Sequence, residues 1–465
     1  MPKTITINPV TRVEGHGKIT LELDEQDRVS NARFSVQEFR GFEKFCQGAL
    51  AERLPSLTAR ICGICPISHH IASVKTVEAC FGVKISPTSE KIRELMMLGQ
   101  LIESHMLSIA ALSLPDLMLG SAKPKDRNII GIYNSGKDAV KKALEIRSFG
   151  TAICYIAGRR PGHPIGARVG GVVSLINEEE KNDLLSRYRE IEPHLGWFSE
   201  LMRSLCEKNA DAIDTLGDIK SSYLGLSNSG SLSFYEGDVK VLNEDGSEAL
   251  SFKPEKYYDN VEEKHENWSY MKFPVLKSGS GFRVGPLARV NIAQKIPTPK
   301  ASEELDWFKA RWGSPVHKTL TYHYARFIET LYAIERARKL LEDQDILKGE
   351  IYTKTKIKAG KGIGIVEAPR GTLVHSYELD SDGKAVKVNL TVATQHNNLG
   401  FNDALKETAS KLVTNASPDE ASLNKLEMIV RAYDPCLSCS THSFGPQSFA
   451  IELLDSERNL IREYR

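Results

Sequence analysis

Hydrophobic residues recur every three or four positions in three long stretches of the chain, and this spacing predicts helices that bury one face. Ser86-Pro87 has the residue types of an N-cap and a first helical position, so we expect a helix from there to about Leu114-Pro115. The apolar stripe of this helix consists of Ile92, Leu95, Met96, Ile102, Met106 and Ile109.

Two further stretches have start signals of their own. Asn177 and Glu180 have the spacing of a capping box, which predicts a second helix running towards Cys206. Ser314-Pro315 is expected to begin a third helix, whose apolar stripe is Leu320, Tyr324, Phe327, Leu331, Ile334 and Leu341. Stripes of this kind usually pack against one another, so the pattern predicts a central long-helix bundle.

Alternating apolar and polar residues predict strands elsewhere in the chain. The first forty residues alternate, and residues 215–300 indicate a β-rich excursion with a hairpin turn at Asp245-Gly246. A second hairpin should turn at 381–383 and pair residues 386–392 with residues 371–379. We therefore expect a mainly α fold with β excursions (α+β), in which residues 1–465 form a single domain whose two ends meet in the middle.

Composition narrows the class of protein. The 465 residues include 61 Lys and Arg against 60 Asp and Glu without a sustained basic block, so charge gives no support for binding nucleic acid or a membrane surface. The first residues lack the features of a signal peptide, and no run of about 18 apolar residues stands out. We expect a cytoplasmic protein with no membrane span and no nucleic-acid partner.

Two Cys-x-x-Cys pairs lie near opposite ends of the chain, Cys62/Cys65 and Cys436/Cys439, and each is followed by a histidine. The inner cysteines are 371 positions apart (436 − 65), so the pairs can act together only if the fold brings both ends to one point. Four converging thiolates would form a site for a soft or borderline metal.

Two simpler explanations fit these pairs less well. A structural zinc site usually spaces its pairs by roughly 15–20 residues, because it closes a local loop. A thioredoxin-like redox motif needs only one pair and a surrounding βαβ pattern, which neither pair has.

Both cysteine motifs lie in longer strings that resemble the paired signatures of the nickel–iron hydrogenase large subunit. The first reads RxCGxCxxxH from Arg60 to His69, and the second reads DPCxxCxxH from Asp434 to His442. Five other strings agree in order along the chain: TRVEGH (11–16), EFRGFEKF (38–45), GHPIGARVGGV (162–172), VGPLARVN (284–291) and EAPRG (367–371). The form of these strings is most similar to the cytoplasmic, multi-subunit, often bidirectional group.

The resemblance implies a catalytic subunit that splits dihydrogen reversibly and heterolytically at a NiFe(CN)2(CO) centre. Nickel would be held by all four cysteines, with Cys65 and Cys439 bridging to the iron and Cys62 and Cys436 binding nickel alone. A related subunit of respiratory complex I shares the fold but has lost these cysteines. A complex I-like scaffold without hydrogen chemistry is therefore the alternative, and the four cysteines of this chain argue against it.

The family implies roles for further residues. Arg370 should reach over the metals and, with Glu14 and Asp434, serve catalysis: Asp434 would pair with Arg370, and Glu14 would be the first proton relay. Thr394 would offer a hydroxyl to a cyanide, and His69 would orient a cysteine thiolate. Glu43 and His442 resemble ligands of a second, hard metal, usually Mg2+, for which oxygen and nitrogen ligands are suited.

The resemblance also implies partner proteins, and this chain differs from other family members at two points. An iron–sulfur small subunit should take the electrons, with further subunits passing them to NAD(P), ferredoxin or another carrier. Membrane-bound members have an Asp eight residues after the His of the long first helix, whereas this chain has Ser113 there and Asp116 further on. A maturation protease normally cuts after the last His of DPCxxCxxH, so residues 443–465 are expected to be a C-terminal extension that is removed.

Overall fold

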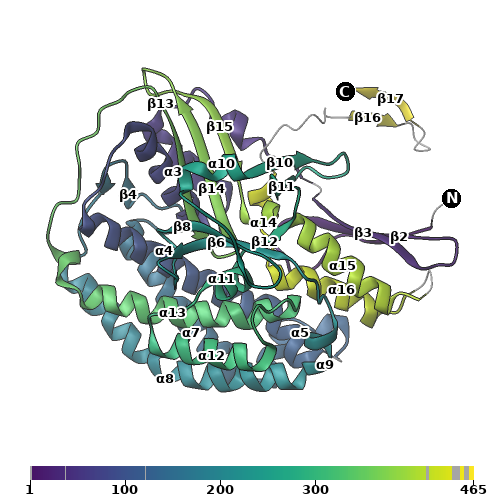
Figure 1. Ribbon diagram of the computed structural model, residues 1–465. Helices are drawn as coiled ribbons and strands as arrows, with labels where there is room; N and C mark the ends of the chain where they lie inside the picture. Colours follow the sequence, from purple (N-terminus) through teal and green to yellow (C-terminus); the bar gives the residue numbers. More distant parts are fainter. Residues whose placement is uncertain are drawn as a thin grey trace.

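The computed structural model describes residues 3–36, 38–120, 122–414, 418–441, 451–454 and 460–464. The helices of ten or more residues are α3 (Pro66–Phe81), α4 (Pro87–Leu107), α7 (Lys137–Gly158), α8 (Glu178–Lys208), α12 (Pro299–Trp312), α13 (Tyr322–Glu342), α15 (Asn398–Leu412) and α16 (Glu420–Tyr433). Several of these long helices, labelled α7, α8, α12 and α13, form a lower layer in Figure 1, and the sheets lie above them. This layer and the sheets above it confirm the predicted α+β class with a long-helix bundle.

Shorter helices connect these elements. They are α1 (Phe42–Phe45), α2 (Leu54–Thr58), α5 (Leu114–Leu119), α6 (Ile129–Ser135), α9 (Ala210–Thr215), α10 (Tyr257–Asn260), α11 (Pro286–Ile292), α14 (Ala393–His396) and α17 (Leu437–Ser440). A π-helix, η3 (Ser108–Ser113), lies between α4 and α5.

The first predicted helix begins where expected but continues further. The Ser86 side chain caps α4 by accepting a hydrogen bond from the backbone N–H of Ser89. Beyond α4 the chain stays helical through η3 and α5, because Pro115 lies in the first turn of α5, where no backbone N–H is needed. Within the described part of the chain, this stretch, Pro87–Leu119, is long and apolar enough to cross a membrane, and 78% of its most apolar window is buried inside the protein.

The second predicted helix is confirmed as α8. Asn177 Oδ1 accepts from the backbone N–H of Glu180 (2.8 Å), and the Glu180 carboxylate accepts from the backbone N–H of Asn177 (2.9 Å). This reciprocal capping box satisfies donors that the first turn of the helix would otherwise leave unpaired.

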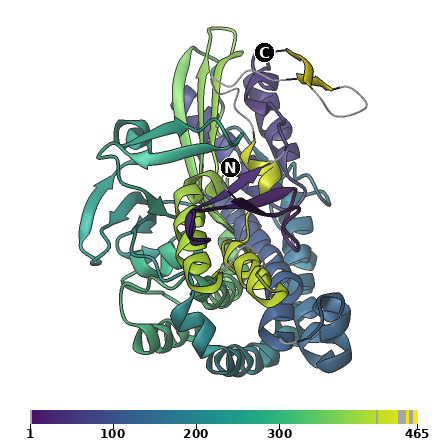
Figure 2. The same ribbon diagram turned by 90° about the vertical axis from the view of Figure 1, so that its right-hand side faces the viewer.

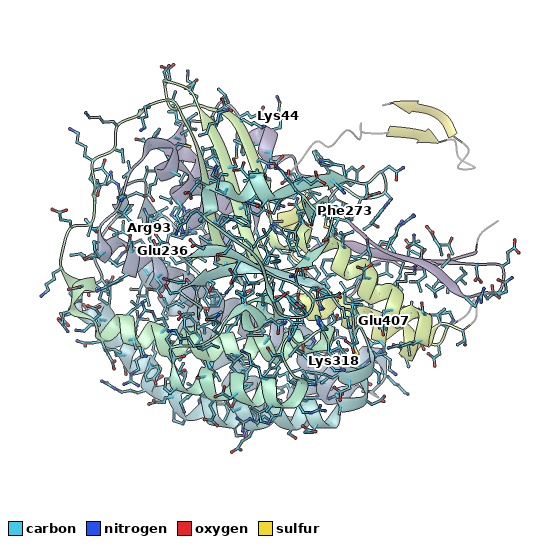
Figure 3. The ribbon with its side chains drawn as sticks, in the orientation of Figure 1. Lys44, Arg93, Glu236, Phe273, Lys318 and Glu407 are labelled. Atoms are coloured by element: carbon cyan, nitrogen blue, oxygen red, sulfur yellow. The ribbon has the colours of Figure 1, made fainter. Side chains whose placement is uncertain are left out.

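The predicted start of the third helix is wrong. Helix α13 begins at Tyr322, while Ser314-Pro315 forms a bend, and the residues just after it bind distant partners through their backbone. Asn291 both accepts from Val316 N and donates to Val316 O at 2.9 Å, and Lys318, labelled in Figure 3, forms an isolated β-bridge with Asp218. These partners are far away in sequence, so no local signal indicated them.

Both predicted hairpins are present, and the β-rich region 215–300 contains β6 to β12. The sheets comprise β1 (Lys3–Ile7), β2 (Gly17–Leu23) and β3 (Val29–Val36); β4 (Ala167–Arg168) and β5 (Gly171–Val172); β6 (Ser222–Asn228), β7 (Ser231–Leu232), β8 (Asp238–Leu242), β9 (Glu248–Phe252) and β12 (Phe282–Arg283); β10 (Val261–His265) and β11 (Lys272–Leu276); β13 (Gly360–Ala368), β14 (Gly371–Leu379) and β15 (Ala385–Thr391); and β16 (Ile451–Leu454) and β17 (Leu460–Tyr464). Strands β8 and β9 flank the turn at 245–246, and β15 pairs antiparallel with β14. The same region also ends in a helix, α11, which the alternation pattern did not predict.

The N-terminal segment lies side by side with α15, α16 and the second cysteine motif. Figure 2 shows the N-terminal strands (purple) over the C-terminal helices (yellow-green), where Phe34 N donates to Asn402 Oδ1 at 2.8 Å. Thr11 N donates to Glu427 Oε1 on α16 at 2.7 Å, and Glu14 forms an isolated parallel β-bridge with Cys436. This junction places the second cysteine motif beside the N-terminal segment.

Candidate metal centre

The four cysteines come from two short turns that both lead into a helix. Cys65 is the N-cap of α3, and the backbone N–H of Ile64 points to Cys62 Sγ at 3.3 Å. Cys436 is the N-cap of α17, which contains Cys439. In each motif the two intervening residues form a tight turn, so both sulfur atoms point to the same side.

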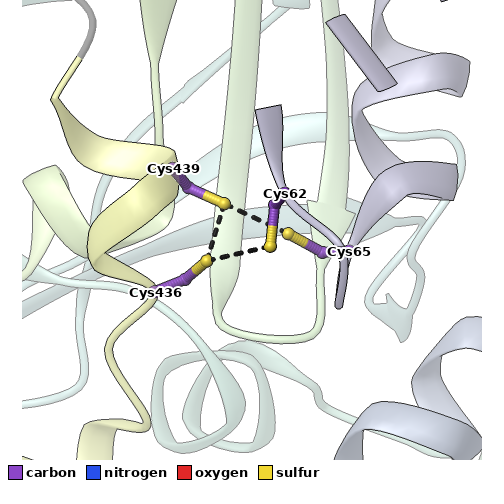
Figure 4. Close-up of side chains that lie close together, drawn as sticks. All are labelled: Cys62, Cys65, Cys436 and Cys439. Carbon is purple, nitrogen blue, oxygen red and sulfur yellow. Dashed lines mark hydrogen bonds between the residues drawn. The ribbon is translucent and has the colours of Figure 1, made fainter. Parts of the chain in front are cut away.

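The structure brings all four sulfur atoms to one point. Cys62 Sγ and Cys436 Sγ are 3.3 Å apart, Cys65 Sγ and Cys439 Sγ are 3.2 Å apart, and Cys436 Sγ and Cys439 Sγ are 2.7 Å apart (Figure 4). All four ligand atoms lie within 4.8 Å of one another, and all four residues are buried. The Cys62–Cys436 and Cys65–Cys439 pairs each join one cysteine of the first motif to one of the second, so neither motif can complete the cluster alone.

The cluster could hold four thiolates only with a bound cation. Burial raises the pKa of the Cys436 and Cys439 thiols well above the usual range. Hydrogen bonds from Cys436 and the other thiols lower the pKa of Cys62 well below its usual value. One thiolate can thus be accommodated by its neighbours, whereas four adjacent thiolates need a bound metal to offset their repulsion. The donor set of four converging sulfurs fits nickel or another soft or borderline metal.

Arg370 and Asp434 form a buried ion pair beside the cluster, as the sequence predicted. Arg370 Nε donates to the backbone oxygen of Asp434 at 2.7 Å, and Arg370 Nη2 donates to Asp434 Oδ1 at 3.1 Å. Arg370 also lies 3.4 Å from Ser104 Oγ through Nη1. Asp434 has a left-handed backbone (φ 55°) at the end of α16, which turns its carbonyl and carboxylate to the same guanidinium.

Thr394 and Glu14 both contact the second cysteine motif. Thr394 Oγ1 accepts from the backbone N–H of Cys436 at 2.9 Å, so its own hydroxyl hydrogen can point to another acceptor. The half-buried Glu14 carboxylate accepts from the backbone N–H of Ser438 at 3.0 Å and from the Ser438 hydroxyl. Ser438 directly precedes Cys439, so Glu14 is bonded to the neighbour of a cluster cysteine.

His69 is bound to a second histidine that the sequence analysis did not single out. Its Nδ1 lies 3.1 Å from His375 Nε2, and His375 Nδ1 lies 2.8 Å from the Tyr377 hydroxyl. Burial lowers the pKa of His69 to about 4, so the ring is neutral. With Nδ1 held by His375, Nε2 is the ring nitrogen of His69 that this contact leaves available.

Glu43 lies among oxygen atoms and one ammonium group. Its Oε1 accepts from Lys272 Nζ and from the backbone N–H of Leu390, both at 2.7 Å. Lys272 also lies 3.1 Å from a Glu263 oxygen and 3.3 Å from the Leu390 carbonyl oxygen. Oxygen atoms of this kind are the ligand type that Mg2+ prefers. The contacts with Lys272 and Leu390 both use Glu43 Oε1, so Oε2 is the carboxylate oxygen that remains for a metal. His442, the other predicted ligand, lies outside the described residues.

Asp116, rather than Ser113, is a buried carboxylate near the end of the first long helix. It accepts from Arg12 Nη2 at 2.5 Å and from Arg431 Nη1 at 2.9 Å. Ser113 instead contacts His323 Nδ1 at 2.9 Å. Through Arg12 and Arg431, Asp116 joins the N-terminal segment to α16.

A buried ionic cluster behind Arg370 was missed by the sequence analysis. Arg289 on α11 donates to Glu329 Oε1 (2.6 Å) and Oε2 (2.7 Å) and to Glu367 Oε2 (2.7 Å). It also donates to the carbonyls of Ala368 (2.9 Å) and Pro369 (3.1 Å), the two residues before Arg370. Arg289 and Glu367 belong to the quoted strings VGPLARVN and EAPRG, but nothing in either string shows that they meet.

Comparisons with known proteins agree with this geometry. A profile of the nickel-dependent hydrogenase family matches residues 40–118 and 204–442, and a profile described as HoxL-like matches residues 4–39. One subunit of the F420-non-reducing hydrogenase vhc of Methanococcus voltae is 39% identical over 458 residues, covering 95% of this chain and 96% of that protein. The beta subunit of the NAD-reducing hydrogenase HoxS of Cupriavidus necator is 34% identical over 485 residues, covering 100% of this chain and 99% of that protein. The structure of an NAD+-reducing NiFe hydrogenase in the H2-reduced state superposes with a TM-score of 0.91 at 36% identity, covering 95% of this chain and 99% of that one.

Proposed function

This chain belongs to the nickel-dependent hydrogenase family as a large, catalytic subunit of the nickel–iron type, and from that premise we propose how its residues hold and serve the metals. Cys62, Cys65, Cys436 and Cys439 hold nickel, and Cys65 and Cys439 also bridge to an iron that carries carbon monoxide and two cyanides. The separations across the site, 3.2 Å for Cys65–Cys439 and 3.3 Å for Cys62–Cys436, support joint binding by all four sulfur atoms. When bound, the metals supply the Lewis acidity that polarises dihydrogen.

Arg370 is the group that this chain directs over the metals. Its guanidinium is 5% exposed and is fixed on one side by Asp434, so its remaining donors are oriented without reorganisation. A fixed cation of this kind can donate to an anionic iron ligand and steady charge that develops as dihydrogen splits. Thr394 supports the same task, because its hydroxyl hydrogen is left to donate.

Glu14 takes the proton from the Cys439 side. Its carboxylate is bonded to Ser438 and lies at the junction of the N-terminal segment and the second cysteine motif. Because Glu14 is half-buried, it can pass a proton from a dry site towards solvent. His69 orients the thiolates through its Nε2, and the His375–Tyr377 contact fixes the ring for that role.

Electrons leave through an iron–sulfur small subunit that docks beside Cys62 and Cys65. Gly63, between these buried cysteines, is exposed, and it lines a surface cavity of about 480 Å³ with Ile64, Tyr155 and Arg160. A cluster seated there would be close to the metals. The carrier beyond it is NAD(P), ferredoxin or another soluble carrier; the relatives include both NAD-reducing and F420-non-reducing hydrogenases.

Three further assignments complete the proposal. Glu43 and His442 bind Mg2+, with Lys272 holding the other carboxylate oxygen of Glu43. A maturation protease removes residues 443–465, and the mature enzyme is cytoplasmic. The complex I-like scaffold is not favoured, because the described fold converges on four cysteines that such a scaffold does not need.

The convergence of four sulfur atoms from both ends of the chain is the observation that carries this proposal. Metal analysis of the purified complex should find one nickel for each copy of this chain, iron in excess of nickel because the small subunit adds iron–sulfur clusters, and no zinc at the four-cysteine site. Infrared spectroscopy should show bands between about 1900 and 2100 wavenumbers from metal-bound carbon monoxide and cyanide, ligands suited to a soft thiolate-bound centre. Zinc in place of nickel, or a spectrum without these bands, would refute it.

A further inference from the structure

Three buried side chains near the Arg370–Asp434 pair have polar atoms without a partner among the described residues. These atoms are His105 Nδ1, Ser108 Oγ, and both Nε and Nη1 of Arg326. The three residues are at most 1% exposed. Buried polar atoms are nearly always hydrogen-bonded in folded proteins, because an unmet group loses its solvation without compensation. Each of these atoms therefore points to a missing partner.

The three side chains lie on two facing helical segments. His105 Nε2 contacts Glu329 Oε2 on α13 at 2.9 Å, and Ser113 Oγ contacts His323 Nδ1 on α13 at 2.9 Å. The contacts run in opposite directions along the two segments, so the helices are antiparallel, as Figure 1 shows for α4 and α13. Ser108 and Arg326 both lie between these two contacts. Their unpaired atoms are thus confined to the same interval of the interface.

This interval adjoins the Arg370–Asp434 pair. Arg326 Nη2 donates to the carbonyl of Ala432, two residues before Asp434, at 3.0 Å. Ser104, which lies 3.4 Å from Arg370 Nη1, is one helical turn before Ser108 on the same face. Asp434, Arg370 and Glu329 all act electrostatically on Arg326. The unpaired atoms therefore lie close to the Arg370–Asp434 pair.

The charges of the region indicate which ligand would fit. Three buried cations, Arg289, Arg326 and Arg370, face three buried carboxylates, Glu329, Glu367 and Asp434. An added anion would have no compensating charge, and it would be costly in a buried site. A neutral molecule that accepts from the guanidinium and also exchanges hydrogen bonds with a hydroxyl and an imidazole satisfies all four atoms. Water is the neutral ligand with these properties.

We propose that His105, Ser108 and Arg326 bind one or more internal water molecules, which we name the interhelical water site. The bound water completes the hydrogen bonding of Arg326 and so holds the Arg326 guanidinium close to Asp434. Arg326 thereby becomes a positioning residue for the Arg370–Asp434 pair. The π-helix η3, which contains Ser108, widens the helix at this point, as π-turns often do at functional sites. The effect on Arg370 rests on the proposed function, whereas the site itself does not.

A crystal structure of the purified hydrogenase complex, at a resolution that shows ordered water, tests the site directly. We expect at least one water within hydrogen-bond distance of Arg326 Nε or Nη1 and of Ser108 Oγ or His105 Nδ1. A map in which Asp434 or Glu329 binds those Arg326 atoms directly, with no water between them, would overturn the proposal.

Two variants test the positioning role. Arg326→Met removes the donors and should shift the cyanide bands in the infrared spectrum and lower the H2 oxidation rate about tenfold at unchanged nickel content, since a hydrogen-bond network to charged groups is lost. Ser108→Ala removes only one hydroxyl, is expected to fold, and should shift the same bands less. Arg338→Met, an exposed position on the same helix, is the control and should shift nothing.

The outcomes separate this proposal from the function itself. Wild-type bands that are present, with no shift in Ser108→Ala or in a nickel-loaded Arg326→Met, would refute the positioning role and leave the hydrogenase assignment intact. Absence of these bands from the wild-type complex would instead count against the metal centre.

Discussion

Replacing Arg289 by methionine should destabilise the protein strongly, because this side chain holds two buried carboxylates and the loop before Arg370. The change removes five hydrogen bonds, to Glu329, Glu367 and the carbonyls of Ala368 and Pro369. Breaking a buried ion pair by removing one partner typically costs about 3–5 kcal/mol. Since a whole domain is stable by only about 5–15 kcal/mol, Arg289→Met should lose about a fifth or more of the free energy of unfolding.

The loss should depend on pH in a defined direction. Burial alone would raise the pKa of Glu329, but Arg289 holds this pKa below its ordinary value. Burial raises the pKa of Glu367 even with Arg289 present. Without Arg289 both carboxyls should have folded-state pKa values above their unfolded ones. The folded variant then binds more protons than the unfolded chain, so its stability should rise as the pH falls. We expect a larger deficit at neutral pH than under mildly acidic conditions.

Urea unfolding of the full-length chain, followed by tryptophan fluorescence, measures this deficit. The triple variant Arg289→Met, Glu329→Gln, Glu367→Gln removes the unpaired charges and should recover most of the lost stability. It should nevertheless oxidise H2 poorly. Arg289 no longer binds the carbonyls of Ala368 and Pro369, so the segment that carries Arg370 loses this support. The reasoning fails if the single variant is as stable as wild type, or if the triple variant is no more stable than the single one.

Four shorter predictions follow from the same geometry. Cys439→Ser should abolish nickel incorporation as measured by metal analysis, and a variant with full nickel content would contradict four-sulfur binding. Burial lowers the pKa of His105 from 6.5 to about 4, so the neutral ring contributes at most about 3 kcal/mol to folding stability; this contribution is complete above the unfolded pKa and is lost as the pH falls towards 4. In urea titrations His105→Gln should lose less stability over that pH range than wild type, and an equal loss would count against this reasoning. Tyr155 is 57% exposed and lines the surface cavity beside Gly63, so Tyr155→Asp should stop copurification of the small subunit; Val386→Asp, at a 52% exposed position on β15, should not. Equal copurification of both variants would show that the small subunit docks elsewhere. Intact-mass measurement of the mature subunit should place its end at His442, and a mass that includes residues 443–465 would refute cleavage.

Local sequence signals were reliable where one short segment supplies its own partners. The Asn177–Glu180 capping box, the Ser86 cap and both hairpin turns were predicted correctly, because each needs only residues within a few positions of one another. The cysteine motifs were also readable, since ligand type and spacing are local properties. The Arg370–Asp434 pair was found only through the family strings that contain it.

Contacts between distant segments decided the rest. The extended backbone at Val316 is bound by Asn291, the ring of His69 is held by His375, and Arg289 joins Glu329 to Glu367 across three elements. A hydrogen bond between residues far apart in the chain leaves no periodic trace in either segment. The sequence by itself thus determined which four cysteines could meet at one metal site and where α4, α8 and the two hairpins begin. Only the folded chain determined how the buried charges around them are balanced, because that balance depends on which distant side chains share a water-free space.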